Sequence, residues 1–157
     1  MARADLIDRG GFGATLKVAA ERAPFIAEKM LLAGAAILAD EVSRRLKTMF
    51  PDARYRLPSA MGVTPVGHDN AGNYNIKIGF GGYQHEVTDA AGRTRLMRKP
   101  AAYQVIARVV ENGRKGPFRI AARPFMSPAV RATKSAVSAA MERAAEQAIE
   151  DITKGAK

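Results

Sequence analysis

Four side chains in the middle of the chain carry groups from which a small metal site could be built. They are His68, Asp69, His85 and Glu86. Imidazole nitrogens and carboxylate oxygens are common zinc ligands, so these residues could in principle serve a metal-dependent nuclease. The two histidines stand 17 residues apart, without the His-x-x-x-His spacing of a helical zinc site. We therefore expect ordinary turn and surface groups here and keep the nuclease as an alternative.

Other catalytic patterns are missing from the sequence. The clusters Gly10–Gly13 and Gly79–Gly82 lack the Gly-Lys-Ser or Gly-Lys-Thr of a phosphate-binding loop and predict turns or hinges. No serine or threonine lies in a nucleophile elbow, and no pair of buried carboxylates is indicated. The chain has no cysteine, which excludes disulfides and thiolate metal sites. We expect no enzyme and no cofactor.

Charge is concentrated in residues 93–123. This segment holds nine basic residues against Glu111 alone, which gives +8 of the chain's net +10. Eight of them are the candidate contacts to a partner or to DNA: Arg93, Arg95, Arg98, Lys99, Arg114, Lys115, Arg119 and Arg123. A solvated loop kept soluble by its charge is the plain alternative. No sequence-reading motif is visible, so any DNA contact should be to the phosphate backbone.

Glu111 and Phe118 lie within this basic segment, and Phe125 follows it. Phe118 and Phe125 could stack on the bases of a single strand, or could anchor the loop ends in the core. We favour the anchor for Phe125, because Pro124 fixes its approach and a helix begins two residues later. Glu111 could be a solvated charge, or could pair with Arg123 or with an arginine of a neighbouring copy.

The flanking helices and hairpins must position these residues. A long helix should carry Pro24 in its first turn and end before Pro51, with Gly34 allowing another element to approach closely. Apolar residues at alternate positions over 74–80, after a turn-rich link at 68–73, predict one hairpin. Segments 84–89 and 93–98 suggest a second hairpin.

The last third of the chain should be mostly helical. Residues 101–112 read as a short helix closed by Gly113, although their β-branched residues make a strand a competitor. Ser127 as N-cap and Pro128 at the first helical position should begin the terminal amphipathic helix. The fold class is therefore α+β, with a long N-terminal helix and a C-terminal amphipathic helix packed on a small antiparallel sheet of hairpins.

The length and hydropathy of the chain indicate how many domains it has and whether it could span a membrane. The 157 residues suit one domain, and we expect a flexible arm over 1–14 and a single α+β domain over 15–154. The longest strongly apolar run, Met30–Ala39, is too short for a membrane span of about 20 residues. The start of the chain has no signal-peptide core. A soluble protein without membrane contact is expected.

The stretch 103–129 carries the most specific residue pattern of the chain. Its residues are Val110-Glu111-Asn112-Gly113, then Ala122-Arg123-Pro124-Phe125, then Pro128-Ala129 around a variable basic loop. This pattern resembles the neck proteins of tailed bacteriophages, in particular the family of tail-completion, or head–tail joining, proteins, and the order of elements matches over roughly residues 16–153. Family members usually carry an aromatic residue at the position of Asn112, and serine or threonine at that of Arg114.

The resemblance implies a structural, non-enzymatic component of a virion or virion-like particle, assembled in the bacterial host cytoplasm. Such proteins form rings, commonly hexamers, between the head-side connector or stopper and the tail tube or tail terminator. Glu111, Gly113, Pro124, Phe125 and Pro128 would then anchor the loop, and its cations would face adjacent rings or packaged double-stranded DNA. A tail terminator, a head-closure protein and a sequence-independent nucleic-acid-binding protein are the alternatives.

Overall fold

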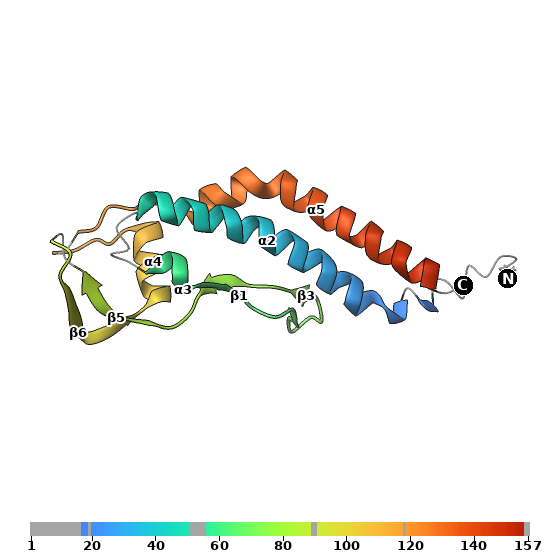
Figure 1. The fold of residues 1–157 in the computed structure, drawn as a ribbon, viewed down its shortest axis with the longest axis horizontal. Coiled ribbons are helices and arrows are strands. Elements are labelled where there is room, and N and C mark those ends of the chain that lie inside the picture. The colour runs from blue at the N-terminus through green and yellow to red at the C-terminus, as the bar shows by residue number, and fades with distance from the viewer. Residues whose placement is uncertain (1–16, 19, 51–55, 89–90, 118, 156–157) are drawn as a thin grey trace, which may run out of the picture.

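The computed structural model describes residues 17–18, 20–50, 56–88, 91–117 and 119–155. It shows an elongated α+β molecule in which two long helices run side by side above a row of short strands (Figure 1). In chain order its elements are α2 (Ala23–Met49), α3 (Leu57–Ala60), β1 (Met61–Val63), β2 (Gly67–His68), β3 (Tyr74–Asn75), β4 (Ile78–Phe80), β5 (Tyr83–Thr88), β6 (Thr94–Ala102), α4 (Tyr103–Asn112) and α5 (Met126–Gly155). The predicted arm, residues 1–14, lies outside the described residues.

Helices α2 and α5 run in opposite directions along the length of the molecule (Figure 1). They approach closely at Gly34, where an added Cβ would lie 2.9 Å from Cγ of Met141 and 3.2 Å from Cγ1 of Val137. This confirms the prediction that Gly34 makes room for another element. Pro24 lies in the first turn of α2, also as predicted, because the helix needs no backbone donor there.

The strands form three two-stranded antiparallel ribbons. Strand β1 pairs with β4 and β2 pairs with β3, so the first predicted hairpin is present as two short ladders around the turn at 69–73. Strand β5 pairs with β6, which confirms the second hairpin, and a bulge follows the pair Gln84–Ala101. This ribbon is longer than the others and extends beyond the helices (Figure 1).

The buried core lies at the end of the molecule where α2 finishes and α5 begins. Its side chains come from all layers: Val42, Leu46, Leu57, Phe80, Tyr103, Ala107, Val110, Phe125 and Ala129. Helix α4 contributes Tyr103, Ala107 and Val110 at helical spacing, which settles the helix–strand ambiguity of residues 101–112 in favour of a helix from Tyr103 onward. The α+β class expected from the sequence is confirmed.

The close approach at Gly34 yields a stability prediction. Gly34→Val should lower the free energy of unfolding by about 1–3 kcal/mol, because the added methyl groups must displace Met141 and Val137. Chemical denaturation of both proteins measures the difference. Ala36→Val, at an exposed position of the same helix, is the matched control and should change stability by about 0.5 kcal/mol or less. Equal effects of both substitutions would contradict tight packing at Gly34.

Candidate functional site

The basic loop between α4 and α5 has a defined backbone path. Gly113 ends α4 with φ of 73° and donates its N–H to the carbonyl of Val109 at 2.8 Å. Arg114 and Ile120 then exchange two backbone hydrogen bonds of 2.9 and 3.0 Å, which fold the loop back on itself. A Cβ at Gly113 would lie 2.8 Å from the carbonyl oxygen of Ile120, so both the dihedral angle and the space require glycine.

Glu111 ties the base of this loop to the start of α5. Its Oε2 accepts hydrogen bonds from the backbone N–H groups of Phe125 at 2.7 Å and Met126 at 2.9 Å. Its Oε1 accepts from the N–H of Ser127 at 3.0 Å and from its hydroxyl at 2.8 Å. The first N–H groups of a helix lack partners within the helix and carry positive partial charge, so a carboxylate is favourable there.

This arrangement corrects two expectations. Glu111 is neither a freely solvated charge nor engaged with Arg123, because it meets the helix N-terminus instead. Ser127 is not the N-cap: α5 begins at Met126, the carbonyl of Phe125 accepts from the N–H of Ala129 at 3.2 Å, and Ser127 donates to Glu111. The capping group thus comes from another helix, which rules for neighbouring residues do not detect.

Phe125 anchors the far end of the loop. Its side chain is 1% exposed and meets the ring of Phe80 edge-on, with 5.8 Å between ring centroids. Next to it, Arg123 donates its backbone N–H to the carbonyl of Val110 at 2.7 Å. The interpretation of Phe125 as a core anchor is confirmed, and base stacking by this ring is excluded. Pro124 is exposed and Pro128 is half-buried, while Phe118 lies outside the described residues.

The environment of Glu111 shifts its ionisation. Burial opposes the charged form, but the hydrogen bonds from Phe125, Met126 and Ser127 outweigh it and hold the pKa of Glu111 below its usual 4.5. The carboxylate is therefore ionised at neutral pH, as a capping group must be to accept four hydrogen bonds.

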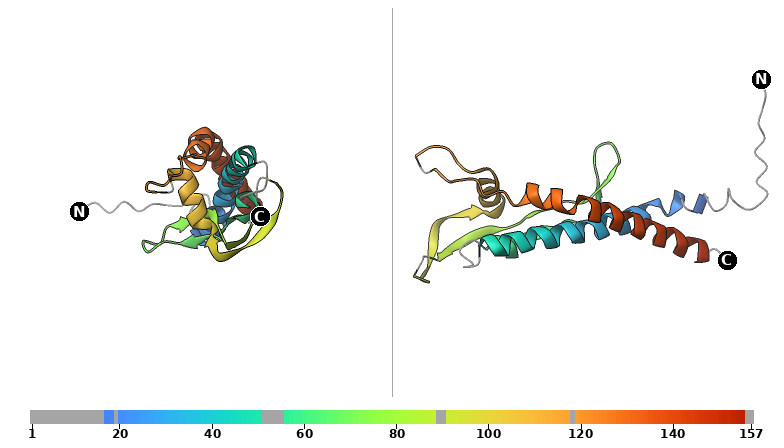
Figure 2. Two further views of the ribbon diagram at one scale, coloured as in Figure 1. Left: turned by 90° about the vertical axis from the view of Figure 1, so that its left-hand side faces the viewer. Right: turned by 90° about the horizontal axis from the view of Figure 1, so that it is seen from above.

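The β5–β6 ribbon and the loop 113–123 project beyond the core at the same end of the molecule. Figure 2 shows them as two separate prongs past the end of α2. We call this pair the basic fork. The ribbon presents Arg93, Arg95, Arg98 and Lys99 and the loop presents Arg114, Lys115, Arg119 and Arg123, all of them exposed. The structure thus brings all eight predicted contact residues to one end.

Most of these cations are not used inside the chain. In the described part of the structure, the side chains of Arg95, Arg98 and Lys99 on the ribbon form no ion pair, nor do those of the four loop cations. Like charges held together on a fixed frame favour an acidic partner or a polyphosphate.

Two exposed aliphatic side chains in the fork were not anticipated. Leu96 on β6 is 78% exposed, and Ile120 in the loop is 45% exposed. Each lies within a few residues of two or more cations, so each prong combines positive charge with an apolar contact. The sequence signal for Leu96 was a large aliphatic residue close to Arg95, Arg98 and Lys99.

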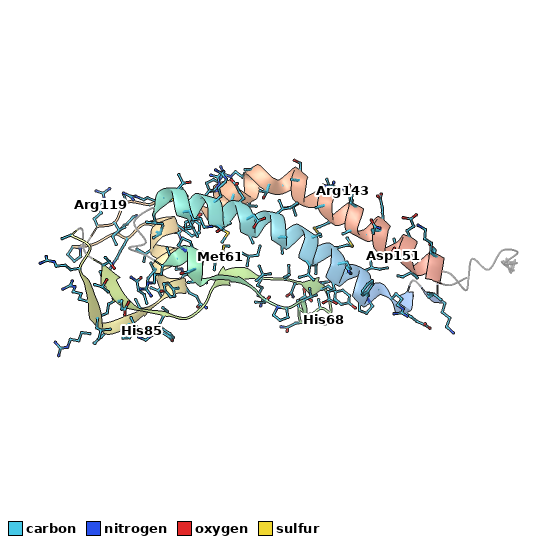
Figure 3. All side chains as sticks on the ribbon, viewed as in Figure 1. Met61, His68, His85, Arg119, Arg143 and Asp151 are labelled. Atoms are coloured by element: carbon cyan, nitrogen blue, oxygen red, sulfur yellow. The ribbon has the colours of Figure 1, made fainter. Side chains whose placement is uncertain are left out.

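The candidate metal ligands are not brought together. His68 and His85 lie in separate ribbons and are far apart along the molecule (Figure 3). The Asp69 carboxylate accepts hydrogen bonds from Ala71 and Asn73 and forms a turn, and Glu86 pairs with Arg56 at 3.0 Å. Over the residues that the structure describes, no group of three or more potential ligands clusters. Asp69 is therefore a turn residue, and Glu86 belongs to an exposed ion pair.

Comparison with protein-family models, with curated proteins and with solved structures finds no match for this chain. Within the described ranges, no helix combines the length and the apolar character needed to cross a bilayer.

Substitution of Glu111 tests its capping role. Glu111→Ala should lower the free energy of unfolding by about 2–3 kcal/mol, because it leaves donors at the start of α5 without their charged acceptor. Glu111→Gln should lose less, because the amide oxygen can still accept from the backbone. Urea denaturation of each protein gives the values. Glu142→Ala, at an exposed glutamate of α5, should stay within about 0.5 kcal/mol of wild type, and a similar loss at both sites would refute the cap.

The lowered pKa of Glu111 predicts a pH dependence. The folded-state pKa of Glu111 lies below its usual value of 4.5, so the ionised carboxylate stabilises the fold above that pH. The stability advantage of wild type over Glu111→Gln should be full above about pH 5 and shrink as the pH falls through the folded-state pKa. Glu41, whose pKa is held at about 2 by Arg44 and Arg45, is common to both proteins and cancels. A difference that grows on acidification would contradict this assignment.

Proposed function

We propose that this chain is a structural, non-enzymatic component of the neck of a tailed bacteriophage or phage-like particle. In this role it is a tail-completion, or head–tail joining, protein that forms a ring, a hexamer in the simplest form, at the head–tail joint of the virion. Its partners are other copies of itself, the head-side connector or stopper, and the tail tube or tail terminator. The basic fork is the surface by which it docks on them.

One observation carries the proposal: the loop of the fork is anchored at both ends, and its four exposed cations form no ion pair within the described part of the chain. Glu111 and Phe125 fix both ends of the loop, so its cations are held in place at the end of the molecule. Holding the loop in place lowers the entropy lost when a partner binds. The resemblance over residues 103–129 concerns this same loop and its anchors.

The elongated shape also supports a place in a layered assembly. The fork lies at one end of the helix pair, and the described end of α5 lies at the other (Figure 1). A subunit of this shape can contact one neighbour with its fork while its helices contact others. Repetition around a ring multiplies weak single contacts into a strong joint.

A sequence-independent nucleic-acid-binding protein is the second candidate, because the exposed cations of the fork also suit phosphates. DNA carries about one negative charge per 1.7 Å of duplex, and binding through cations weakens steeply as salt rises. Tail terminator and head-closure proteins remain further candidates within the same kind of particle.

Reversal of two loop charges tests the docking role. Arg114→Glu with Lys115→Glu should leave folding unchanged, because both side chains are exposed and form no ion pair within the described part of the chain. In a host that produces the particle but lacks the wild-type gene, this variant should reduce the yield of joined, infectious particles by at least tenfold. Electron microscopy should then show separate heads and tails.

Lys17→Glu with Lys77→Glu is the control, since it makes the same change in net charge at exposed positions outside the fork. It should leave the joining of heads and tails unaffected. Normal joining by the loop variant would refute the docking role. If that variant also lost salt-sensitive binding to duplexes of unrelated sequence, the nucleic-acid-binding candidate would be favoured.

A further inference from the structure

The outer face of α5 carries a second charged surface, of opposite sign to the fork. Glu142, Glu146 and Glu150 follow one another at four-residue spacing and therefore lie in a row on one side of the helix. Ile149, three residues after Glu146, lies beside this row and is 47% exposed. We call these four residues the acidic row.

The glutamates of the acidic row form few ion pairs within the described part of the chain. Glu142 and Glu146 form no ion pair in the described part of the structure, and Glu150 contacts Lys154 at 2.8 Å in an exposed pair of small energetic value. Like charges at four-residue spacing on a helix destabilise it by roughly 0.2–0.5 kcal/mol per pair. The nearby Arg143 directs its Nε to the carbonyl of Ala139 in the same helix. An external partner would account for a row that opposes the stability of its own helix.

The fork and the acidic row complement each other in composition. On β6, Leu96 lies within three residues of Arg95, Arg98 and Lys99 and pairs across the ribbon with Glu86. On α5, Ile149 lies three residues after Glu146 and next to Glu150. An apolar contact surrounded by opposite charges is the usual composition of a specific protein interface. Phosphates would satisfy the arginines of the fork but would leave Leu96 in water.

The two surfaces lie too far apart to meet within one molecule. Glu146 is 20 residues into α5, about 30 Å along the axis from its start at the fork end. Figure 3 shows the same separation, with Arg119 at one end of the molecule and Asp151 near the other. The complement of each surface is therefore a second copy of the chain.

We propose that copies associate head to tail, with the β5–β6 prong of one copy docked on the acidic row of the next. This inference rests on the proposed function and names its contact between subunits. Two different surfaces that bind each other form a heterologous interface, which produces a closed ring when the rotation between copies closes. The loop prong 113–123 then remains available for the adjoining layer of the particle.

Two charge-reversal variants of the full chain test the contact. The first is Arg95→Glu with Arg98→Glu on the prong, and the second is Glu146→Lys with Glu150→Lys on the row. Wild type should form a discrete oligomer in analytical ultracentrifugation at tens of micromolar protein and low salt, and should dissociate as salt is raised. Each variant alone should be monomeric, because the prong cations of the first variant then sum to zero, and both the prong and the row of the second variant are positive.

An equimolar mixture of the two variants supplies the decisive measurement. The unchanged prong of the second variant still matches the unchanged row of the first, whereas the two altered surfaces do not attract each other. The mixture should therefore recover a dimer that contains one copy of each variant. Lys17→Glu with Lys77→Glu and Glu21→Lys with Glu28→Lys are controls of equal charge change at exposed positions that belong to neither surface, and should assemble as wild type does. Circular dichroism and thermal unfolding confirm that each variant folds.

Each result decides for or against the contact. Recovery of oligomers in the mixture supports it. A monomeric wild type at low salt, unimpaired assembly of either variant, or a mixture that stays monomeric would overturn it.

Leu96→Ser should weaken association at least tenfold without changing net charge, and an unchanged affinity would refute the apolar contact. The neck proposal fails separately, if heads and tails join normally with the loop charges reversed.

Discussion

The carboxylate of Glu111 at the N-terminus of α5 is the interaction on which the rest of this structure depends. It accepts three backbone N–H groups and one hydroxyl from residues 125–127, which lie 14 to 16 positions later in the chain. These four hydrogen bonds close the loop at its base, join α4 to α5, and place Phe125 against Phe80. Because the partners belong to the unsatisfied end of a helix, the contact combines a cap, a favourable dipole interaction and a loop closure.

The position of the core follows from this closure. Buried side chains from α2, α3, β4, α4 and α5 meet where the chain leaves α4 and enters α5. Beyond the core, α2 and α5 continue as a two-helix rod whose close approach depends on small residues such as Gly34. The well-packed end of the molecule is therefore also the end that holds the fork, so that charged prongs extend from a rigid base.

In this fold, the packing and capping contacts that stabilise the chain lie apart from the exposed charged side chains. The cations of the fork and the glutamates of the acidic row are exposed, and few of them form ion pairs within the described residues. Their self-repulsion opposes folding slightly and is tolerated because packing and capping lie elsewhere. Surface charges with so little use inside the subunit are a reason to seek their partners in an assembly.

The sequence by itself determined the features that depend on neighbouring residues: the helix start at Pro24, the turn at Gly113, the hairpins, the α+β class and the charge of residues 93–123. Local rules suffice there, because dihedral preferences and side-chain periodicity act over a few positions. Only the tertiary structure decided the partner of Glu111, the separation of His68 from His85, the exposure of Leu96, and the placement of fork and acidic row at opposite ends. These depend on the path of the chain through space, since a capping acceptor or a complementary surface can come from any distance along the sequence.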